Sequence, residues 1–448
     1  MIEKIKHCTT CMILLTLGLF FISIMARFIS KNLLLEAFGL DNWLVRAIWW
    51  DYPAGLDMQE EQVSVDWKKE YPYKQEDESR EPGFITGKYN KLQNKLRAAE
   101  AVIDKYATDY LVNRVKLIEY ANNIEKLAGW NLQCYTDYNS VTFLEDGYLT
   151  GIEAVKDMTE IADNLGDLNE FLSSYNIPVV YVHIPAKTCP YLDGELAETV
   201  DFSNQNADSL LEKLKARGVP CLDLREAIHA QGLNHHELYY ITDHHWKVES
   251  GLWAAGVIAD YLNREEGFQI EPELYDQSHY DFTIYPEWFL GSQGKKVTLA
   301  KTRADDFTVV IPRFETSLNC EIPSLGMREE GDFRILLDES KYQEKDVYNM
   351  SPYHAYSWGD NALMTVTNLN DKSGKSILLI HDSYGDPVAP FMALGVETLY
   401  SMDMRFFSGS LQSFIEQKQP DLVIVMYYAG TLQETVNYGT HDSPFDFR

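Results

Sequence analysis

Hydrophobic and polar positions follow three different patterns along this chain of 448 residues. Residues 9–26 contain no charged side chain. Over residues 92–127, apolar side chains recur in alternating steps of four and three, the spacing of a long helix with heptads. From residue 130 onward, short apolar runs alternate with amphipathic stretches, a rhythm typical of α/β domains. We therefore predict a membrane anchor over residues 1–30, a juxtamembrane stalk and long helix over 31–129, and an α/β domain over 130–448.

The uncharged run is long enough to cross a membrane. Its 18 residues just span the hydrocarbon core, because each residue of a helix rises about 1.5 Å. No Ala-x-Ala-like cleavage site follows, so we expect an uncleaved signal anchor rather than a removed signal peptide. Basic residues before and after the run nearly balance, so the positive-inside rule leaves the orientation open. We expect a single-pass protein of the cell membrane.

The heptad helix over residues 92–127 is followed by Gly129, a residue that commonly ends helices. Two interpretations remain open. In the first, the apolar seam pairs with a second copy or a partner helix, and Asn113 sets the register of a homodimer. In the second, the helix lies along its own domain.

Within the α/β domain, the apolar runs predict the order of the elements. A hairpin is expected at 140–149, and residues 265–365 are expected to be an insertion with mixed β structure, because their alternation is weak. The predicted helices cover 164–174, 210–216, 246–262 (opened by Thr242 and Asp243), 387–394 and 411–417. The predicted strands cover 177–184, 219–224, 376–380, 397–402 and 422–426. This order predicts an α/β fold with a doubly wound, mostly parallel sheet.

Composition and charge narrow the class of partner. The chain has 45% apolar and 24% charged residues, which is typical of a globular protein. Its net charge of −29 disfavours binding to nucleic acid or to an anionic lipid surface. A neutral or cationic glycan, or a small neutral donor, is compatible with that charge.

The six cysteines indicate neither zinc nor redox chemistry in the α/β domain. Cys8 and Cys11 lie at the membrane, and the other four are scattered singly. A disulfide such as Cys189–Cys221 and a set of buried free thiols both remain open.

One strand and turn carry the first candidate for chemistry. The apolar strand at 376–380 stops at His381-Asp382-Ser383, and Gly385 permits a sharp turn into the helix predicted at 387–394. A serine in this position lies at the carboxyl end of a central strand, where α/β sheets place their chemistry. We expect its hydroxyl to face the positive end of that helix, which would stabilise an oxyanion. The alternative is a serine that only caps a helix after a buried strand.

The second candidate is the turn that contains Asp243, His244 and His245. Side chains two residues apart in a turn can converge, so Asp243 could accept a hydrogen bond from His245 and fix its tautomer. The other ring nitrogen would then be free to take a proton from a serine. The alternative is that Asp243 is the N-cap of the next helix and the histidines are incidental.

A metal site competes with this interpretation. Five of the eleven histidines fall between residues 229 and 245. Neighbouring histidines on a turn diverge, however, and no His-x₃-His or cysteine partner has the spacing of metal ligands. We expect no metal, and nothing in the chain indicates a cofactor.

The two candidates together resemble a known family. Asp-His-His-Trp at 243–246, followed by Asp-Ser-Tyr at 382–384, resembles the DHHW family, which is similar to the SGNH-hydrolase-type alginate O-acetyltransferases. The resemblance spans roughly residues 135–440 and implies an SGNH-hydrolase-like sheet. Each motif is weak alone, and their order is the specific part. Supporting matches lie at 146–149, 185–187, 222–225, 403–405 and 420–421.

The resemblance implies roles for the residues of both candidates. Ser383 would be the nucleophile that holds an acyl group, His245 its general base, and Asp243 the residue that orients the base. His244 is the fallback base and a substrate-binding candidate. The backbone amide of Ser383 would stabilise the oxyanion.

Two further substrate-binding candidates depart from the wider class. Arg405 and Tyr428 occupy positions where a plain hydrolase of this class would show Gly and Asn. The alternatives are that Arg405 pairs with Asp403 and that Tyr428 belongs to the core. Lys187 lies at the end of another strand, where such families place further donors; the alternative for Lys187 is a simple surface charge.

The implied function is a membrane-anchored, extracytoplasmic O-acetyltransferase that acts on a cell-surface polysaccharide or exopolysaccharide. Resemblance to the alginate system implies that a membrane-bound O-acyltransferase supplies the acetyl group. Two alternatives remain open: a carbohydrate acetylesterase of the same fold, and a catalytically silent surface scaffold that uses the heptad helix for assembly.

Overall fold

The computed structural model describes residues 141–144, 146–193, 201–428, 445 and 447, all within one compact unit. The predicted anchor, stalk and heptad helix over residues 1–129 lie outside the described residues, and so does the predicted dimer contact. Among the described helices, none has the length and apolar character that crossing a bilayer requires. The fold below is therefore that of the predicted α/β domain.

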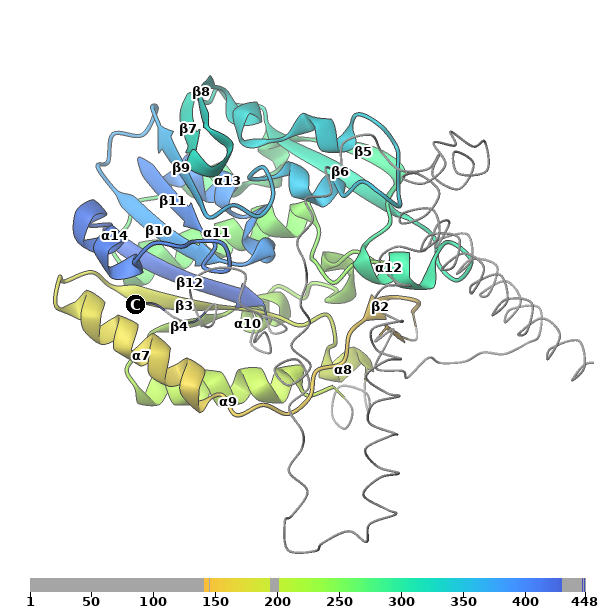
Figure 1. Cartoon of the computed structure of the whole chain (residues 1–448), viewed down its shortest axis with the longest axis horizontal. Helices are drawn as coiled ribbons and strands as arrows, with labels where there is room; N and C mark the ends of the chain where they lie inside the picture. The colour runs from red at the N-terminus through yellow and green to blue at the C-terminus, as the bar shows by residue number, and fades with distance from the viewer. Residues whose placement is uncertain (1–140, 145, 194–200, 429–444, 446, 448) are drawn as a thin grey trace, which may run out of the picture. The chain divides into compact units, whose positions relative to one another are not determined.

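A central sheet of eight strands, in the order β4-β3-β12-β10-β11-β9-β7-β8, organises the domain (Figure 1). The strands from β4 to β11 in this order are parallel, and β9, β7 and β8 continue the sheet antiparallel. The α/β class with a central sheet is thus confirmed. The strands are β3 (Val179–Ile184), β4 (Cys221–Asp223), β7 (Leu318–Ile322), β8 (Met327–Gly331), β9 (Leu363–Asn368), β10 (Ser376–His381), β11 (Thr398–Met402) and β12 (Leu422–Tyr428).

Helices cover both faces of the sheet because successive side chains of each parallel strand point to opposite sides. On one face, Tyr181, Leu378 and Val423 pack with residues of α7 (Thr159–Ser173), α9 (Ser203–Ala216) and α14 (Leu411–Lys418). On the other, Val182 and Leu379 pack with α11 (Val248–Glu265) and α13 (Ala389–Met392). In Figure 1, α7 and α9 run together below the strands. The remaining helices are α8 (Pro190–Asp193), α10 (Leu224–Ala230) and α12 (Ser292–Val297).

The segment at 265–365 has mixed β structure, as predicted, but most of its strands belong to the central sheet. β7, β8 and β9 extend that sheet beyond β11. Only β5 (Tyr280–Phe289) and β6 (Asp305–Pro312) form a separate antiparallel ribbon. The predicted hairpin at 140–149 is confirmed, with β1 (Thr142–Phe143) paired antiparallel to β2 (Leu149–Thr150).

Four predicted helix limits are wrong. α7 and α9 begin at Thr159 and Ser203, before the predicted residues 164 and 210, and the other two lie beside the candidate site. The helix expected from residue 246 begins at Val248, with Lys247 at its N-cap position, so Thr242 and Asp243 do not open it. The helix expected at 387–394 is shorter: α13 covers Ala389–Met392 and a 3₁₀ turn, Ala393–Gly395, follows it, while another 3₁₀ turn, Ser383–Gly385, precedes it. Prolines at 387 and 390 lack the amide hydrogen that a longer helix needs. Ser383 therefore does not face the end of a full helix.

The described cysteines form no disulfide. Cys189, Cys221 and Cys320 are all free, so the Cys189–Cys221 bond is absent. Cys189 and Cys320 are buried thiols that pack in the interior.

Candidate functional site

Ser383 lies in a tight turn directly after β10. The carboxylate of Asp382 accepts hydrogen bonds from the amides of Tyr384, at 2.9 Å, and of Tyr428, at 2.8 Å. These bonds attach the turn to β12, the neighbouring strand. A side chain at Gly385 would have its Cβ 2.2 Å from the His381 ring, so only glycine fits that close approach. Ser383 is 8% exposed and lies at the carboxyl end of the sheet.

The segment from Tyr239 to Trp246 is a loop, which we call the DHH loop, closed by an antiparallel bridge between these two residues. Two hydrogen bonds tie it to the serine turn. The indole of Trp246 donates to the Tyr384 carbonyl at 3.0 Å, and the Tyr384 hydroxyl donates to the His244 carbonyl. Two segments far apart in the sequence are thereby held side by side.

Ser383, His245 and Asp243 meet at this junction in a hydrogen-bonded chain. The His245 Nε2 atom is 2.7 Å from Ser383 Oγ, and its Nδ1 atom is 2.5 Å from Asp243 Oδ1. An ionised carboxylate only accepts, so Nδ1 carries the hydrogen and Nε2 accepts from the serine hydroxyl. Burial alone would raise the pKa of Asp243, but the neighbouring His244 and His245 outweigh burial and hold it well below its usual value. This arrangement can remove a proton from Ser383.

Asp243 is not a helix cap, so that alternative is wrong. Its Oδ1 atom accepts from the His245 amide at 3.0 Å, and its Oδ2 atom accepts from the Ser292 amide at the start of α12. A Cβ at Gly291 would lie 2.2 Å from the Cβ of Asp243, which shows how closely α12 packs on this side chain. Both carboxylate oxygens are therefore held in place.

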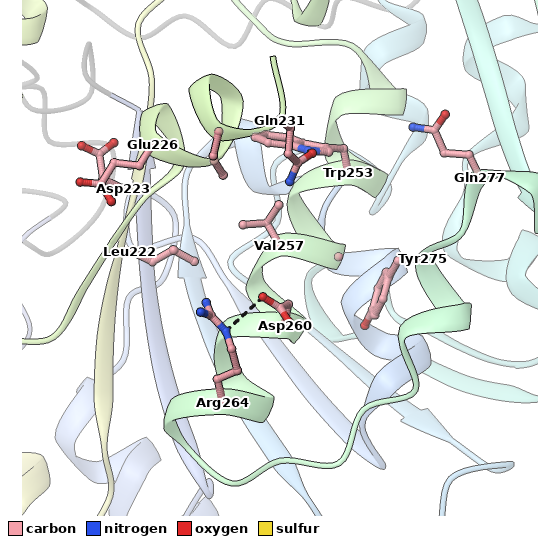
Figure 2. A pocket seen from close by; sticks show the side chains of 13 residues that line it. Leu222, Asp223, Glu226, Gln231, Trp253, Val257, Asp260, Arg264, Tyr275 and Gln277 are labelled. Carbon is pink, nitrogen blue, oxygen red and sulfur yellow. Dashed lines mark hydrogen bonds and ion pairs between the residues drawn. The ribbon is translucent and has the colours of Figure 1, made fainter. Parts of the chain in front are cut away.

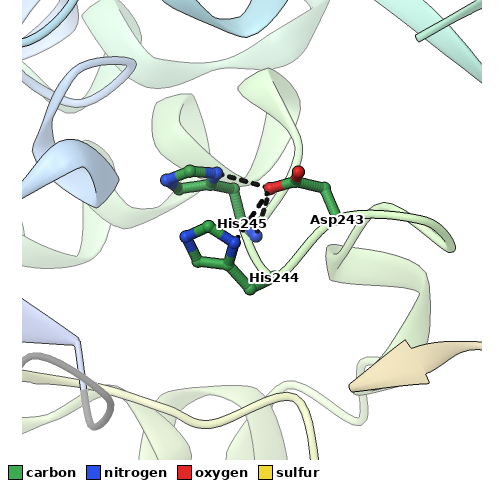
Figure 3. Close-up of side chains that lie close together, drawn as sticks. All are labelled: Asp243, His244 and His245. Atoms are coloured by element: carbon green, nitrogen blue, oxygen red, sulfur yellow. Dashed lines mark hydrogen bonds and ion pairs between the residues drawn. The ribbon is translucent and has the colours of Figure 1, made fainter. Parts of the chain in front are cut away.

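His244 lies over His245 (Figure 3), and it is His245 whose Nε2 atom is hydrogen-bonded to Ser383. The two ring centroids are 3.8 Å apart, and the His244 Nδ1 atom is 3.0 Å from Ser292 Oγ. Partial desolvation of the ring, followed by repulsion from His245, lowers the pKa of His244. Its side chain is 35% exposed, so a neutral imidazole borders the solvent side of the site. In this arrangement the imidazole hydrogen-bonded to Ser383 is that of His245, and the fallback role of His244 stays a prediction.

The same three side chains are close enough to raise the question of a metal. Ligand atoms of Asp243, His244 and His245 lie within 4.8 Å of one another (Figure 3). However, His245 Nδ1 and Asp243 Oδ1 are 2.5 Å apart, which is a hydrogen-bond distance. An ion between them needs about 2.0 Å to each atom and a wide angle at the metal, so the pair would have to separate. The geometry fits a shared hydrogen better than a shared ion.

Arg405 and Tyr428 have different surroundings. The Arg405 guanidinium donates to Asp403 at 2.7 Å and to Asp360 at 2.9 Å, so the expected pairing with Asp403 is present. The Tyr428 ring stacks on Tyr384 with centroids 4.3 Å apart and is partly exposed. Substrate binding by Arg405 and Tyr428 stays a prediction.

Two residues lie beside the site although the sequence did not place them there. Tyr353, which no motif singled out, stacks on His245 at 4.2 Å and donates its hydroxyl to the Ser383 carbonyl at 2.9 Å. Lys187 is not a surface charge: it is 1% exposed and reaches the DHH loop. Its place at the end of β3, in Pro-Ala-Lys, was a usable signal. Tyr353 gave no such signal.

A separate groove lies between α10 and α11 (Figure 2). It encloses about 510 Å³ and shares no lining residue with the Ser383 site. Carboxylates, amides and two aromatic rings line it, and Arg264 pairs with Asp260 inside it. The labelled lining residues are Leu222, Asp223, Glu226, Gln231, Trp253, Val257, Asp260, Arg264, Tyr275 and Gln277.

Comparison with known proteins shows which folds the chain resembles. A family model described as the SGNH hydrolase-like domain of the acetyltransferase AlgX matches residues 143–281. A DHHW family protein from Eubacterium siraeum has a similar structure, with a TM-score of 0.50 and 20% identity over 65% of this chain and 91% of that one. Bacillus cereus PatB1, solved with a sulfonyl adduct, has a TM-score of 0.55 and 18% identity over 69% of this chain and 98% of that one. No curated protein matches the chain.

The family model shows that residues 143–281 are similar to an SGNH hydrolase-like domain, and together with the solved structures it confirms the resemblance predicted from the two motifs. The matched segment contains Asp243, His244 and His245 but ends before Ser383. Because the identities are so low, the solved structures show a similarity of the fold alone. A function for the site is therefore proposed from its own geometry.

Proposed function

We propose that this protein is an O-acetyltransferase that moves acetyl groups to hydroxyl groups of a polysaccharide through Ser383, His245 and Asp243. The observation that carries the proposal is the hydrogen-bonded chain of 2.7 Å and 2.5 Å that joins these three side chains. The AlgX family model, described as an acetyltransferase domain, supports acyl transfer as the reaction class. The net charge of −29 favours a neutral or cationic acceptor over an anionic polymer.

The proposed first step loads the serine. Ser383 Oγ attacks the carbonyl carbon of the acetyl donor while His245 Nε2 takes the hydroxyl proton. The tetrahedral intermediate collapses, the donor's leaving oxygen takes that proton from His245, and an acetyl ester remains on Ser383. The ionised Asp243 stabilises the imidazolium that forms in between. The Ser383 amide is the proposed donor to the oxyanion.

In the proposed second step, a sugar hydroxyl replaces the leaving group. His245 Nε2 takes the proton of that hydroxyl as its oxygen attacks the acetyl carbonyl. The bond to Ser383 Oγ then breaks, and the serine regains its proton from His245. Water can enter the same step, which would make the protein an acetylesterase. The partly exposed His244 and Tyr428 border the position from which an acceptor would approach.

We further propose that residues 9–26 anchor the domain outside the membrane and that a membrane-bound O-acyltransferase supplies the acetyl group. The uncharged run supports an anchor, and an anchored domain would lie where such a partner delivers its product. Assembly into a homodimer through residues 92–127 is part of the same proposal.

The test is acetyl transfer from p-nitrophenyl acetate with a panel of neutral and amino-sugar oligosaccharides. We expect the mass of Ser383 to increase by one acetyl group without acceptor, and the ester to move to an oligosaccharide when one is present. Ser383→Ala should abolish both reactions. Turnover to free acetate alone, unchanged by any acceptor, would instead identify an esterase. A fully folded protein whose Ser383 stays unmodified would support the silent scaffold.

A further inference from the structure

We propose that Lys187 is a positioning residue for the reaction, because its ammonium group holds the DHH loop in the conformation that aligns Asp243 with His245. The inference rests on the proposed function and assigns a role to a residue that does not touch Ser383 itself. A second residue, Asp305, binds amide groups of the same loop, whereas Lys187 binds its carbonyl groups.

The Lys187 ammonium is fully used by main-chain carbonyl groups. It donates to the carbonyl oxygens of Leu149 at 2.6 Å, Tyr240 at 2.7 Å and Asp243. An ammonium group has three hydrogens, so three carbonyls account for every donor. Two of these carbonyls belong to the DHH loop and the third belongs to β2. Lys187 thus joins the end of β3, the β1–β2 hairpin and the loop.

Asp305, at the start of β6, binds the amide groups of the same loop. Its carboxylate accepts from the amides of Ile241 at 2.7 Å and Thr242 at 2.8 Å, and from the Thr242 hydroxyl. Lys187 takes the carbonyls of residues 240 and 243, while Asp305 takes the amides between them. The loop is therefore fixed by one buried cation and one buried anion, each satisfied by hydrogen bonds.

This anchoring acts directly on the chemistry. Asp243 offers its carbonyl to Lys187 and its carboxylate to His245. A backbone rotation at Asp243 would therefore move the carboxylate that sets the His245 tautomer. Because the His245 hydrogen bonds to Asp243 and Ser383 are short, a small shift of the loop weakens both. Loss of the Lys187 contacts should lower the rate of acylation more than the affinity for a small ester.

The charge state of Lys187 gives this role a measurable signature. The carboxylates of Asp243, Asp305 and Asp146 interact electrostatically with the Lys187 ammonium. The centroid of the Tyr148 ring lies 5.8 Å from that ammonium, and His244 also interacts with its charge. Burial lowers the pKa of Lys187 to about 7, and the three carboxylates oppose that shift. Above its pKa the amine has two hydrogens for three carbonyls. The rate should therefore fall on the alkaline side, well below the ordinary lysine value of about 10.4.

The test follows modification of Ser383 by phenylmethylsulfonyl fluoride, and turnover of p-nitrophenyl acetate, from pH 5 to pH 10. In Lys187→Met we expect at least a tenfold lower rate at neutral pH, little change in KM, and no alkaline fall. The matched control is Lys156→Met, a partly buried lysine whose pKa is also lowered by burial and whose charged neighbours are Glu160 and Glu153. That control should keep both the rate and the alkaline fall of the unaltered protein.

A second variant keeps the test decisive should Lys187→Met fail to fold. Asp146→Asn removes a negative charge that raises the pKa of Lys187, so the alkaline fall should move to lower pH. An alkaline fall that stays in place in either folded variant, or is absent from the unaltered protein, would overturn the role of Lys187. Failure of the proposed function looks different: Ser383 would then not be modified in the unaltered protein at any pH.

Discussion

The ring of Tyr353 lies almost flat against the ring of His245, with centroids 4.2 Å apart and planes 22° from parallel. The same side chain donates its hydroxyl to the Ser383 carbonyl at 2.9 Å. The ring of His244 also contacts the ring of His245, with centroids 3.8 Å apart. The imidazole therefore has neighbours that restrict its rotation, and one of them also holds the serine turn.

Removing the two contributions of Tyr353 separately should give different results. Tyr353→Phe keeps the stacked ring but loses one buried hydrogen bond, which costs about 0.5–1.5 kcal/mol of unfolding free energy. We expect its turnover of p-nitrophenyl acetate to change little. Tyr353→Ala loses the ring as well, so His245 gains freedom and kcat should fall at least tenfold. Equal kcat in the two variants, measured beside denaturant unfolding, would show that stacking does not position His245.

Asp243 should matter through the tautomer of His245. Asp243→Asn keeps the size of the side chain, but its amide can donate to Nδ1 and leave the hydrogen of the imidazole on Nε2. An Nε2 atom that carries a hydrogen has no lone pair to accept the serine proton. Ser383 acylation should therefore fall by about 10³–10⁴-fold. His244→Gln is the comparison, since it is His245 that is hydrogen-bonded to Ser383. A loss in His244→Gln as large as that in Asp243→Asn would point to His244 as the base.

The parts of the fold that follow from the sequence are those dominated by continuous burial. β3 and β10 lie within two residues of their predicted limits, because strands buried on both faces are uninterrupted apolar runs. β9 alternates between buried and half-buried positions, and β8 is mostly exposed. Such strands carry a weak signal, so the sequence predicts an insertion where the structure has the antiparallel part of the sheet.

The candidate site divides in the same way. Asp243, His245 and Ser383 stand in recognisable motifs, so their meeting was predictable from the sequence order of those motifs. Tyr353 reaches His245 only through tertiary packing, which has no local pattern. A surface charge is the simple expectation for Lys187, because a lysine is almost never fully buried unless it is paired. Here three backbone carbonyls supply the pairing, and those cannot be read from side-chain identities.

Arg405 offers a way to separate a structural role from substrate binding. Burial raises the pKa of Asp403 to about 6 even with Arg405 beside it, so the carboxylate depends on the guanidinium at neutral pH. Arg405→Met should lower the unfolding free energy by about 3–5 kcal/mol near pH 8, because Asp403 loses its partner. The deficit should shrink toward pH 5 as Asp403 takes up a proton. A stable variant with a raised KM would instead favour substrate binding.

Tyr428 should distinguish the two half-reactions. Its ring is partly exposed and stacks on Tyr384, whose backbone carbonyl accepts from Trp246. We expect Tyr428→Ala to raise KM for an oligosaccharide acceptor severalfold, because a sugar loses a stacking surface. Acylation of Ser383 by p-nitrophenyl acetate should change much less. Tyr428→Phe keeps the ring and serves as the control. A parallel loss of acylation in the alanine variant would place Tyr428 in support of the turn instead.

Acid should destabilise the domain well above the pH at which carboxylates titrate. Burial lowers the pKa of His183 and of His235 to about 4 each, while the unfolded chain binds these protons near pH 6.5. Between those values the unfolded state holds more protons, so stability falls as pH falls, by up to about 1.4 kcal/mol per pH unit for each histidine. His236, whose pKa is raised by Asp193 and Asp146 against the effect of burial, works in the opposite direction. Urea unfolding from pH 4 to pH 7 gives the dependence of the unfolding free energy on pH. This dependence should be shallower in His235→Asn than in the unaltered protein, and an identical dependence would contradict the role of His235.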